Sequence, residues 1–337
     1  MFHWIDSPLK AVIALIFFSY IVNLASDKLG DVLHVLGIKL KIPGSVRGAT
    51  FDAISSSFPE FATAMIAVVV YNQFADVGVP TVAGSAVFNI LLIPMASIFA
   101  FKGAKVTLHV QKSTTIRDMS FYIVSIGVLA LFTYLGAFTV VSGLILLSIY
   151  VTYIVVLYFQ TKKYQNDLNG DEHDDEDDED MSIPQILFWM VVTISAVWVS
   201  IDAIIQSAIT VAAALNIPTY IVSVIIIAAC TSIPDTLLSV KSARKGDADG
   251  AIANAIGSNI FDICICLGFP MLIAGKSIPV DFAQNAGVLF FVFISMLVTG
   301  FLLLQGEKVG KKHAYIMLCV YILFLGYITS KALGLVA

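Results

Sequence analysis

Long apolar runs separated by short polar breaks fill the chain from end to end. A helix needs about 20 mainly apolar residues to cross a bilayer, and ten runs reach that length. The predicted spans are residues 9–27, 43–73, 79–101, 118–136, 138–160, 183–208, 217–243, 249–275, 282–304 and 313–334. This pattern predicts an all-α polytopic membrane protein with ten transmembrane helices.

The second and seventh predicted spans differ from the others, because each is long and carries a proline near its middle, Pro59 and Pro234. Proline inside a helix removes one backbone hydrogen bond and clashes with the preceding turn. We therefore expect a broken or kinked helix at both places. The lost hydrogen bonds are expected to free backbone carbonyls around Ala53 and Ala228.

Positive charge is distributed unevenly between the two sides that ten spans would define. Of the 19 Lys and Arg residues, 16 fall in the loops after odd-numbered spans, and only Lys10, Lys276 and Lys331 fall on the opposite side. Loops rich in Lys and Arg stay in the cytoplasm. We therefore expect an integral protein of the plasma (inner) membrane with both termini outside. A miscounted span would move every later loop to the other side, so the charges support the count.

Composition agrees with a membrane protein, since 58% of the residues are hydrophobic and the mean hydropathy is +0.91. Soluble domains are about 45–50% apolar. The basic residues are scattered through short loops, which excludes a nucleic-acid-binding surface. The four cysteines lie inside apolar segments and are expected to be free thiols packed as small hydrophobic residues. The first apolar run has no small-residue cleavage site after it, so we expect a retained span.

An acidic stretch at residues 161–182 divides the chain into two halves, 1–160 and 183–337, with five spans each. Because five is odd, the second half must enter the membrane in the opposite direction. Related halves would then form two inverted five-helix repeats, as in many secondary transporters. The stretch holds ten of the 24 acidic residues, and we interpret it as a solvated cytoplasmic linker. The functional alternative is weak Ca²⁺ gathering or regulation.

Two pairs of short motifs indicate that the halves are related. SSSFPE at 55–60 is followed by GSAVFNI at 84–90, and CTSIPD at 230–235 is followed by GSNIFDI at 257–263. The two motifs stand in the same order, on the second and third spans of each half. The acid-to-serine spacing is also similar, with 25 residues in the first half and 23 in the second.

These motifs place carboxylates inside the predicted membrane segments, at Glu60, Asp235 and Asp262. A charged side chain at the bilayer centre costs several kcal/mol unless it is paired or lines a wet cavity. No Lys or Arg lies deep in any predicted span. The expected partner is therefore a mobile cation, and hydroxyls, carbonyls and carboxylates are hard oxygen ligands that suit Ca²⁺ or Na⁺.

Helical spacing extends this expected site. Ser85 and Asn89 are four residues apart, as are Ser258 and Asp262, so each pair shares one helix face. The neighbouring glycines, Gly84 and Gly257, are expected to let the helices approach closely.

A structural interpretation competes with each of these assignments. A single Ser or Thr hydroxyl in a membrane helix commonly bonds to its own backbone, and a single proline commonly forms a kink. Two further acids also lie in apolar surroundings. Asp52 is interpreted either as an accessory ligand or as the wall of a hydrated vestibule. Asp202, near the end of the sixth predicted span, is expected to face water or a helix terminus.

The motif regions at 47–93 and 224–268 resemble the α-repeats of the sodium/calcium exchangers, in the calcium/cation antiporter superfamily. GATFDAISSSFPEF, TSIPD and ARKGDADGAIANAIGSNIFDI are most similar to the potassium-dependent branch. There are departures from the family pattern. Ser55 and Cys230 replace the usual glycine before the hydroxyl pair, Ser56 stands where many exchangers have Thr, and Asp52 is an extra acid.

The resemblance implies a role for each matching residue. Glu60 and Asp235 would be the central Ca²⁺ carboxylates, bound alternately by Na⁺. Asn89 and Asp262 would lie beside them, with Asp262 the residue associated with K⁺. The hydroxyls of flanking Na⁺ sites would come from Ser56, Ser57, Ser85, Thr231, Ser232 and Ser258, and carbonyls from Ala53 and Ala228. No covalent cofactor is implied.

The resulting hypothesis is a Na⁺-driven Ca²⁺ antiporter that works by alternating access in a lipid bilayer, and not an enzyme. By family analogy the first and sixth spans would slide past the motif helices. A Ca²⁺/H⁺ exchanger is the alternative in the same class, and a passive cation channel is another. An intramembrane aspartyl protease is disfavoured because its GxGD pattern is absent. K⁺ cotransport, ion stoichiometry and oligomeric state are left open.

Overall fold

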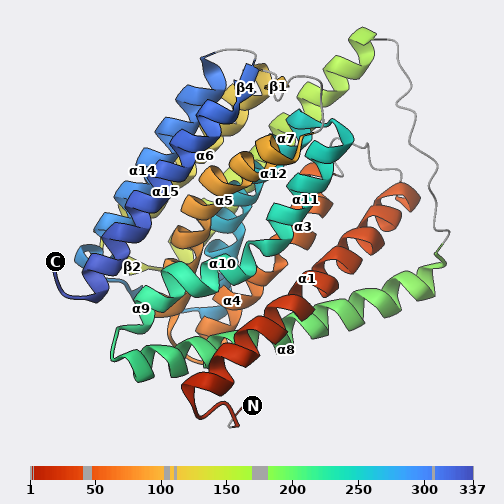
Figure 1. Cartoon of the computed structure of the whole chain (residues 1–337). Coiled ribbons are helices and arrows are strands. Elements are labelled where there is room, and N and C mark those ends of the chain that lie inside the picture. Colours follow the sequence, from red (N-terminus) through yellow and green to blue (C-terminus); the bar gives the residue numbers. More distant parts are fainter. Residues whose placement is uncertain are drawn as a thin grey trace.

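The computed structural model describes most of the chain, and nearly all of that part is helical (Figure 1). The described residues are 2, 4–40, 48–101, 107–109, 112–168, 181–305 and 308–336. Within them, nine helices or helix series are long and apolar enough to cross a membrane. The helix α4 (Phe58–Val69) is a shorter apolar helix, and it lies in the second predicted span.

Most of the spans are single long helices. These are α1 (Pro8–Lys39), α5 (Val79–Ala100), α6 (Lys112–Tyr134), α7 (Val140–Leu168), α8 (Ile183–Leu215), α14 (Phe282–Leu304) and α15 (Lys311–Ala332).

The remaining segments are series of short helices that include π-helical turns, labelled η. The first series is η1 (Gly48–Asp52), α3 (Ala53–Ser56) and α4, and η2 (Phe74–Gly78) leads into α5. The second series is α9 (Thr219–Val222), η3 (Ser223–Ile227), α10 (Ala228–Thr231) and α11 (Ile233–Lys245). The third series is α12 (Ala248–Phe261), η4 (Asp262–Cys266) and α13 (Gly268–Ala274).

Several boundaries differ from those predicted. The helix α1 continues to Lys39 instead of ending at residue 27, because Leu29, Val32 and Leu33 keep a buried apolar face along the polar extension. The helix α8 ends at Leu215 instead of residue 208, where Asn216 adopts a left-handed conformation with a φ of 55°. An apolar pattern predicts helix ends poorly, because a helix can continue while polar residues occupy one of its faces.

The acidic stretch at 161–182 is partly described. Residues 161–168 continue α7 in place of the predicted linker, and α8 begins directly after Ser182. Gln185 accepts a hydrogen bond from the backbone N–H of Ser182 at 2.8 Å, which caps the start of α8. The acidic residues at 169–180 lie outside the described residues.

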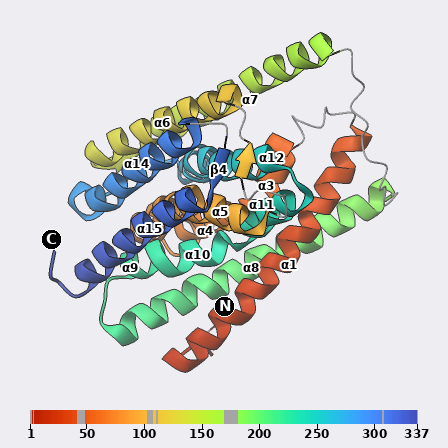
Figure 2. The ribbon, with the colours of Figure 1, turned by 45° about the horizontal axis from the view of Figure 1, so that its top comes forward.

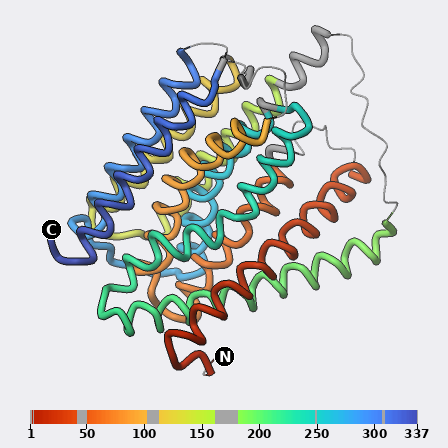
Figure 3. The backbone as a smooth tube through the Cα atoms, viewed as in Figure 1, coloured from red at the N-terminus to blue at the C-terminus, as the bar shows by residue number. Residues whose placement is uncertain are grey.

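The helices form three groups side by side. The helices α1 and α8 pack against each other along their lengths on one side, and α6, α7, α14 and α15 lie on the other (Figure 2). Between them lie α5, α12 and the broken series that contain α4 and α11. The backbone trace in Figure 3 shows the N-terminal helix and the first helix of the second half running together along this edge. The motif helices therefore occupy the middle of the molecule.

Two short antiparallel sheets connect loops that are distant in sequence. The strand β1 (Thr107–His109), after α5, pairs with β4 (Lys308–Gly310), after α14. The strand β2 (Ala137–Phe138), after α6, pairs with β3 (Ile278–Pro279), after α13. Each sheet joins two loops that the alternation of spans assigns to the same side.

The two broken series match from the π-helical turn to the start of the helix after the break. Each has a five-residue π-helical turn, a four-residue helix, and one residue that breaks the helix. The breaking residues, Ser57 and Ser232, have similar backbone angles, with φ and ψ of −94° and 7° in the first and −83° and 0° in the second. A new helix then begins with proline as its second residue. The predicted breaks at Pro59 and Pro234 are confirmed.

The two motif glycines differ in their surroundings. A Cβ atom on Gly84 would lie 2.1 Å from the carbonyl oxygen of Val224 and 2.9 Å from Cβ of Ala228. The helix α5 therefore contacts the η3–α10 backbone directly, as expected. A Cβ atom on Gly257 would contact only the Tyr153 hydroxyl, at an ordinary 3.8 Å. The expectation of close packing is therefore wrong for Gly257.

This difference predicts opposite responses to the same substitution. We expect Gly84→Ala to lower the free energy of unfolding by at least ~1–3 kcal/mol, because the new methyl group overlaps a backbone carbonyl. Gly257→Ala is expected to be neutral or slightly stabilising, because Ala is the better helix former. Thermal unfolding of the purified protein in detergent measures both. Equal effects of the two substitutions would contradict this packing.

Candidate cation site

Three buried carboxylates meet in the middle of the molecule. Glu60 lies on α4, Asp235 on α11, and Asp262 at the junction of α12 and η4, and each is fully buried. One carboxylate oxygen from each residue lies within 4.8 Å of the others. Within the described ranges, none of the ion pairs involves these three residues. The structure thus brings together the three acids that the motifs predicted.

The broken helices explain how two of these acids are positioned. Glu60 and Asp235 are each the third residue of the helix that begins after the break. The first N–H groups of a helix have no partner within it and carry a partial positive charge. A carboxylate in the first turn is therefore favoured by the backbone. This local effect offsets part of the cost of burying the two charges.

Hydroxyl groups from both halves surround Glu60. Ser85 and Ser232 each donate a hydrogen bond to its Oε1, at 3.3 and 3.2 Å. The two serine oxygens are 3.1 Å apart, and Thr231 Oγ1 lies 3.5 Å from Ser85 Oγ. The other carboxylate oxygen of Glu60, Oε2, is buried and has no hydrogen-bond partner.

The second half provides a matching arrangement around Asp235. Ser258 donates to Asp235 Oδ1 at 2.7 Å, as Ser85 donates to Glu60. Asn89 Nδ2 lies 3.5 Å from Asp235 Oδ2, so the amide of the first half reaches the acid of the second. The predicted i, i+4 pairs therefore do share a face, and that face lines the carboxylate group.

Some of the remaining predicted hydroxyls bond to their own helix, and others are available as cation ligands. Ser56 Oγ donates to the backbone carbonyl of Asp52 at 2.8 Å, and Thr231 Oγ1 donates to that of Ala228 at 3.1 Å. These two bond to their own helices. Ser57 Oγ is fully buried with no partner, so it is available to a ligand.

The predicted carbonyl ligands are not freed by the prolines. The Ala53 carbonyl accepts the N–H of Ser57 at 2.9 Å, and the Ala228 carbonyl accepts the N–H of Ser232 at 3.1 Å. A proline removes the hydrogen bond to the residue four positions before it, which is Ser55 or Cys230. A carbonyl oxygen has two lone pairs, so Ala53 and Ala228 stay candidate ligands without having been freed.

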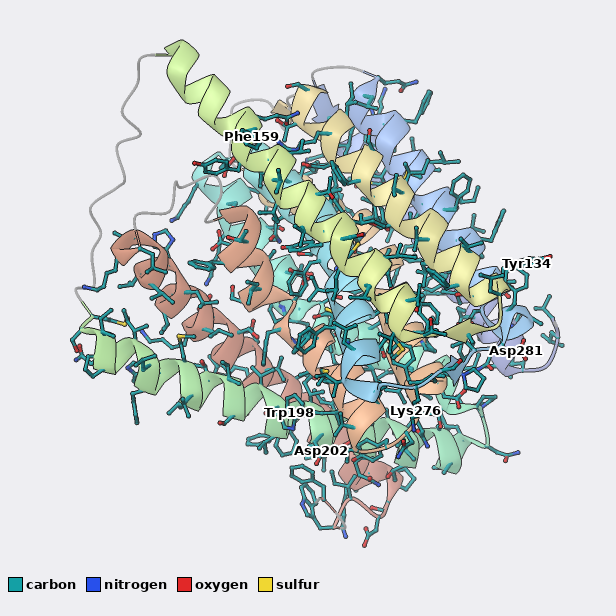
Figure 4. All side chains as sticks on the ribbon, turned by 180° about the vertical axis from the view of Figure 1, so that it is seen from behind. Tyr134, Phe159, Trp198, Asp202, Lys276 and Asp281 are labelled. Atoms are coloured by element: carbon teal, nitrogen blue, oxygen red, sulfur yellow. The ribbon has the colours of Figure 1, made fainter. Side chains whose placement is uncertain are left out.

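The two further acids, Asp52 and Asp202, are not members of the carboxylate group. Asp52 is half-buried at the end of η1, and its backbone carbonyl accepts bonds from Ser55 and Ser56. Asp202 is half-buried within α8 and accepts a hydrogen bond from the Tyr71 hydroxyl at 2.7 Å. Of the two expected surroundings of Asp202, the helix terminus is wrong, because α8 continues to Leu215. Its side chain is partly exposed, so contact with water stays a prediction. Figure 4 labels Asp202 on α8, in the lower part of the view.

Sequence reasoning missed three polar residues beside the site. Asn254 Nδ2 lies 3.3 Å from the Asp235 carbonyl, and Cys266 Sγ lies 3.7 Å from Asp262 Oδ1. Both extend the four-residue spacing of Ser258 and Asp262, so the same-face argument would have found them. Asn259 donates to the Ala86 carbonyl at 3.0 Å, and no spacing signal points to it.

Several polar atoms at the site are buried and have no hydrogen-bond partner. They are Ser57 Oγ, Glu60 Oε2, Asn89 Oδ1 and Asp262 Oδ2. An unpartnered buried polar atom costs about 1–3 kcal/mol, and more when it is charged. All four are oxygens, the ligand type that Ca²⁺ and other hard cations prefer. The arrangement is therefore suited to binding a hard cation.

Comparison with known proteins agrees with the motif resemblance. A family model described as sodium/calcium exchanger protein matches residues 10–159 and 185–330. Human sodium/potassium/calcium exchanger 4 is 37% identical over 125 residues, which cover 37% of this chain and 19% of that protein. The chain thus spans about a fifth of the length of this relative. The inner membrane protein YrbG of Escherichia coli is 27% identical over 275 residues, which cover 80% of this chain and 82% of that protein.

Solved structures share the fold. The crystal structure of the H⁺/Ca²⁺ exchanger CAX has a TM-score of 0.74 at 15% identity, covering 94% of this chain and 81% of that chain. The sodium-calcium exchanger NCX_Mj has a TM-score of 0.63 at 21% identity, covering 94% of this chain and 97% of that chain. The family model matches both halves of the chain over most of their length, so this protein belongs to the sodium/calcium exchanger family.

Proposed function

We propose that this protein exchanges Na⁺ for Ca²⁺ across a membrane and that the two ions compete for one site. The observation that carries the proposal is the group of three buried carboxylates, one oxygen of each within 4.8 Å of the others. Because no described Lys or Arg pairs with them, these charges need a cation from solution. One Ca²⁺ or several Na⁺ can balance them, so the same ligands serve both ions in turn.

The proposed ligands are those that the motifs predicted. Glu60, Asp235 and Asp262 supply the carboxylates, and Asn89 supplies an amide oxygen. Hydroxyls and carbonyls would come from Ser56, Ser57, Ser85, Thr231, Ser232, Ser258, Ala53 and Ala228. Ca²⁺ takes six to eight oxygen ligands, and this set is large enough to provide them. Ser56 and Thr231 would have to leave their own helices, or contribute at the edge of the site.

We further propose that ten spans form two inverted five-helix repeats. The matching broken series support this relation. So does the contact between Asn259 and Ala86, because the aligned motifs make these residues equivalent and their bond is 3.0 Å long. Equivalent residues meet each other near a two-fold axis. Both termini would lie outside and the stretch at 161–182 in the cytoplasm.

Alternating access would use α1 and α8 as the moving pair. Two of the described side-chain interactions connect this pair to the central part of the molecule, one at each end of the bundle. Asp202 on α8 accepts a bond from Tyr71 after α4, and Asp27 on α1 pairs with Lys241 near the end of α11. The first is half-buried and the second is exposed, so the Tyr71 bond is the stronger constraint. Sliding of the pair would have to break one or both.

A Ca²⁺/H⁺ exchanger is the second candidate, and the same carboxylates favour it. Neighbouring acids that cannot all ionise can be neutralised by protons as well as by Na⁺. The hydroxyls around Glu60 favour Na⁺, because a proton needs no additional oxygen ligands. The driving ion is therefore decided by experiment.

We expect reconstituted protein to accumulate Ca²⁺ in vesicles when a Na⁺ gradient is imposed and the pH gradient is clamped at zero. Asp235→Asn is expected to abolish this uptake, because it removes a charge that balances the cation. Asp76→Asn is the matched control, since this exposed acid in η2 lies outside the site and is expected to keep the uptake. Uptake driven by a pH gradient alone, with none under the Na⁺ gradient, would contradict Na⁺ exchange and support the second candidate.

The family resemblance also predicts a role for K⁺ at Asp262. If K⁺ is cotransported, Na⁺-dependent Ca²⁺ uptake by the wild type will rise when K⁺ is added to the Ca²⁺ side. The Asp262→Asn variant is expected to lose this response, and uptake assays with and without K⁺ measure it. A wild-type flux that does not change with K⁺ would eliminate cotransport and leave simple Na⁺/Ca²⁺ exchange.

The hydrogen bond between Tyr71 and Asp202 predicts that its removal makes local unfolding around Tyr71 easier. Tyr71→Phe keeps the ring but removes the hydroxyl, and a hydrogen bond to a charged group is worth about 1.5–3 kcal/mol. We therefore expect backbone hydrogen exchange in residues 66–73 to become about 10-fold faster or more. Tyr20→Phe, at an exposed tyrosine of α1, is the control. Equal exchange rates in the two variants would show that the bond does not hold α8 to α4.

A further inference from the structure

One buried group at the site has no role in the proposed exchange. Cys266 is fully buried at the end of η4, and its Sγ lies 3.7 Å from Asp262 Oδ1 and 3.9 Å from the Ser57 carbonyl oxygen. It is a free thiol. The thiol therefore adjoins one member of the carboxylate group, Asp262.

A buried cysteine commonly serves only as a small hydrophobic residue, but its neighbours here are oxygens. The same two residues also carry buried polar atoms without a hydrogen-bond partner, Asp262 Oδ2 and Ser57 Oγ. Cys264 provides the contrast, because its Sγ lies 3.2 Å from Ser125 Oγ on α6. In the first half, the position four residues after Asn89 is Ile93, so the repeat does not require a thiol there.

We propose that Cys266 and Asp262 form a binding site for a thiol-seeking divalent cation such as Cd²⁺ or Zn²⁺. Thiolates select such metals, whereas Ca²⁺, Na⁺ and K⁺ take oxygen ligands. Zn²⁺ binds sulfur at about 2.3 Å and carboxylate oxygen at about 2.0–2.2 Å. With these bond lengths, the observed separation of 3.7 Å between Sγ and Oδ1 gives an angle of roughly 115° at the metal. That angle is close to tetrahedral.

Binding replaces the thiol proton with the metal, and the proton is released to water. The bound ion also neutralises charge that would otherwise hold Ca²⁺. The site is therefore inhibitory, a consequence that rests on the proposed function. Metal binding itself can be measured without transport.

The test is a Cd²⁺ titration of the purified protein in Na⁺-free detergent solution, followed by the ultraviolet charge-transfer absorption of a cadmium–thiolate bond. We expect the band in the wild type and its loss in Cys266→Ser. Loss of a metal ligand should weaken Cd²⁺ binding by about 10-fold or more. Binding of ⁴⁵Ca²⁺ should change much less, because Ca²⁺ does not use the thiol.

Controls separate the thiol from the other cysteines. Cys264→Ser is expected to keep the band, and so is a variant that retains Cys266 while Cys230, Cys264 and Cys319 are changed to Ser. The proposal is overturned if the band persists in Cys266→Ser, or if the variant that retains only Cys266 lacks it. Wild-type protein that shows the band but binds no ⁴⁵Ca²⁺ would contradict the proposed function and leave the thiol site standing.

Discussion

Three carboxylates buried together, with no basic partner in the part of the chain that the structure describes, are the constraint on which the rest of the structure depends. At an effective dielectric of about 20, two unit charges 4.8 Å apart repel by roughly 3 kcal/mol. Three such pairs would cost roughly 10 kcal/mol in addition to the cost of burial. Two of the acids gain from helix N-termini, and hydroxyls donate to one oxygen of Glu60 and one of Asp235. A helix terminus is worth about 0.3–1 kcal/mol and a hydrogen bond to a charged group about 1.5–3 kcal/mol. Together they offset the mutual repulsion at most and leave the cost of burial, which a bound cation would offset under the proposed function.

The local backbone follows from this requirement. A continuous helix would bond its N–H groups internally, whereas the breaks at Ser57 and Ser232 begin new helices just before Glu60 and Asp235. Because α5 lacks a side chain at Gly84, it can contact the η3–α10 backbone and bring Ser85 and Asn89 to the acids. Proline, serine and glycine in the motifs thus act together. The serines and prolines interrupt the helices, and Gly84 lets two helices approach, so that oxygen atoms from several helices come together.

Much of the fold and of the site could be predicted from the sequence, because hydrophobic length and helical spacing are local properties. Hydrophobic length and the spacing of the motif residues were enough to predict the spans, the two breaks and the meeting of Glu60, Asp235 and Asp262. Partners across the bundle could not be predicted, since spacing along one helix does not say what faces it. The Tyr71 bond made Asp202 a contact between α4 and α8, and Gly257 proved to have space beside it. Cys266 was missed because its residue type suggested packing, although its spacing from Asp262 matched the polar face.

The central claim is that Ca²⁺ and Na⁺ use the same carboxylates in turn, and equilibrium binding tests it without any gradient. Purified protein would be loaded with ⁴⁵Ca²⁺, and the bound ion would be measured as Na⁺ replaces choline at constant ionic strength. The account predicts that Na⁺ displaces all of the bound Ca²⁺ with a Hill coefficient above one, since several Na⁺ replace one Ca²⁺. Retention of Ca²⁺ at saturating Na⁺, with Na⁺ bound at the same time, would contradict a shared site.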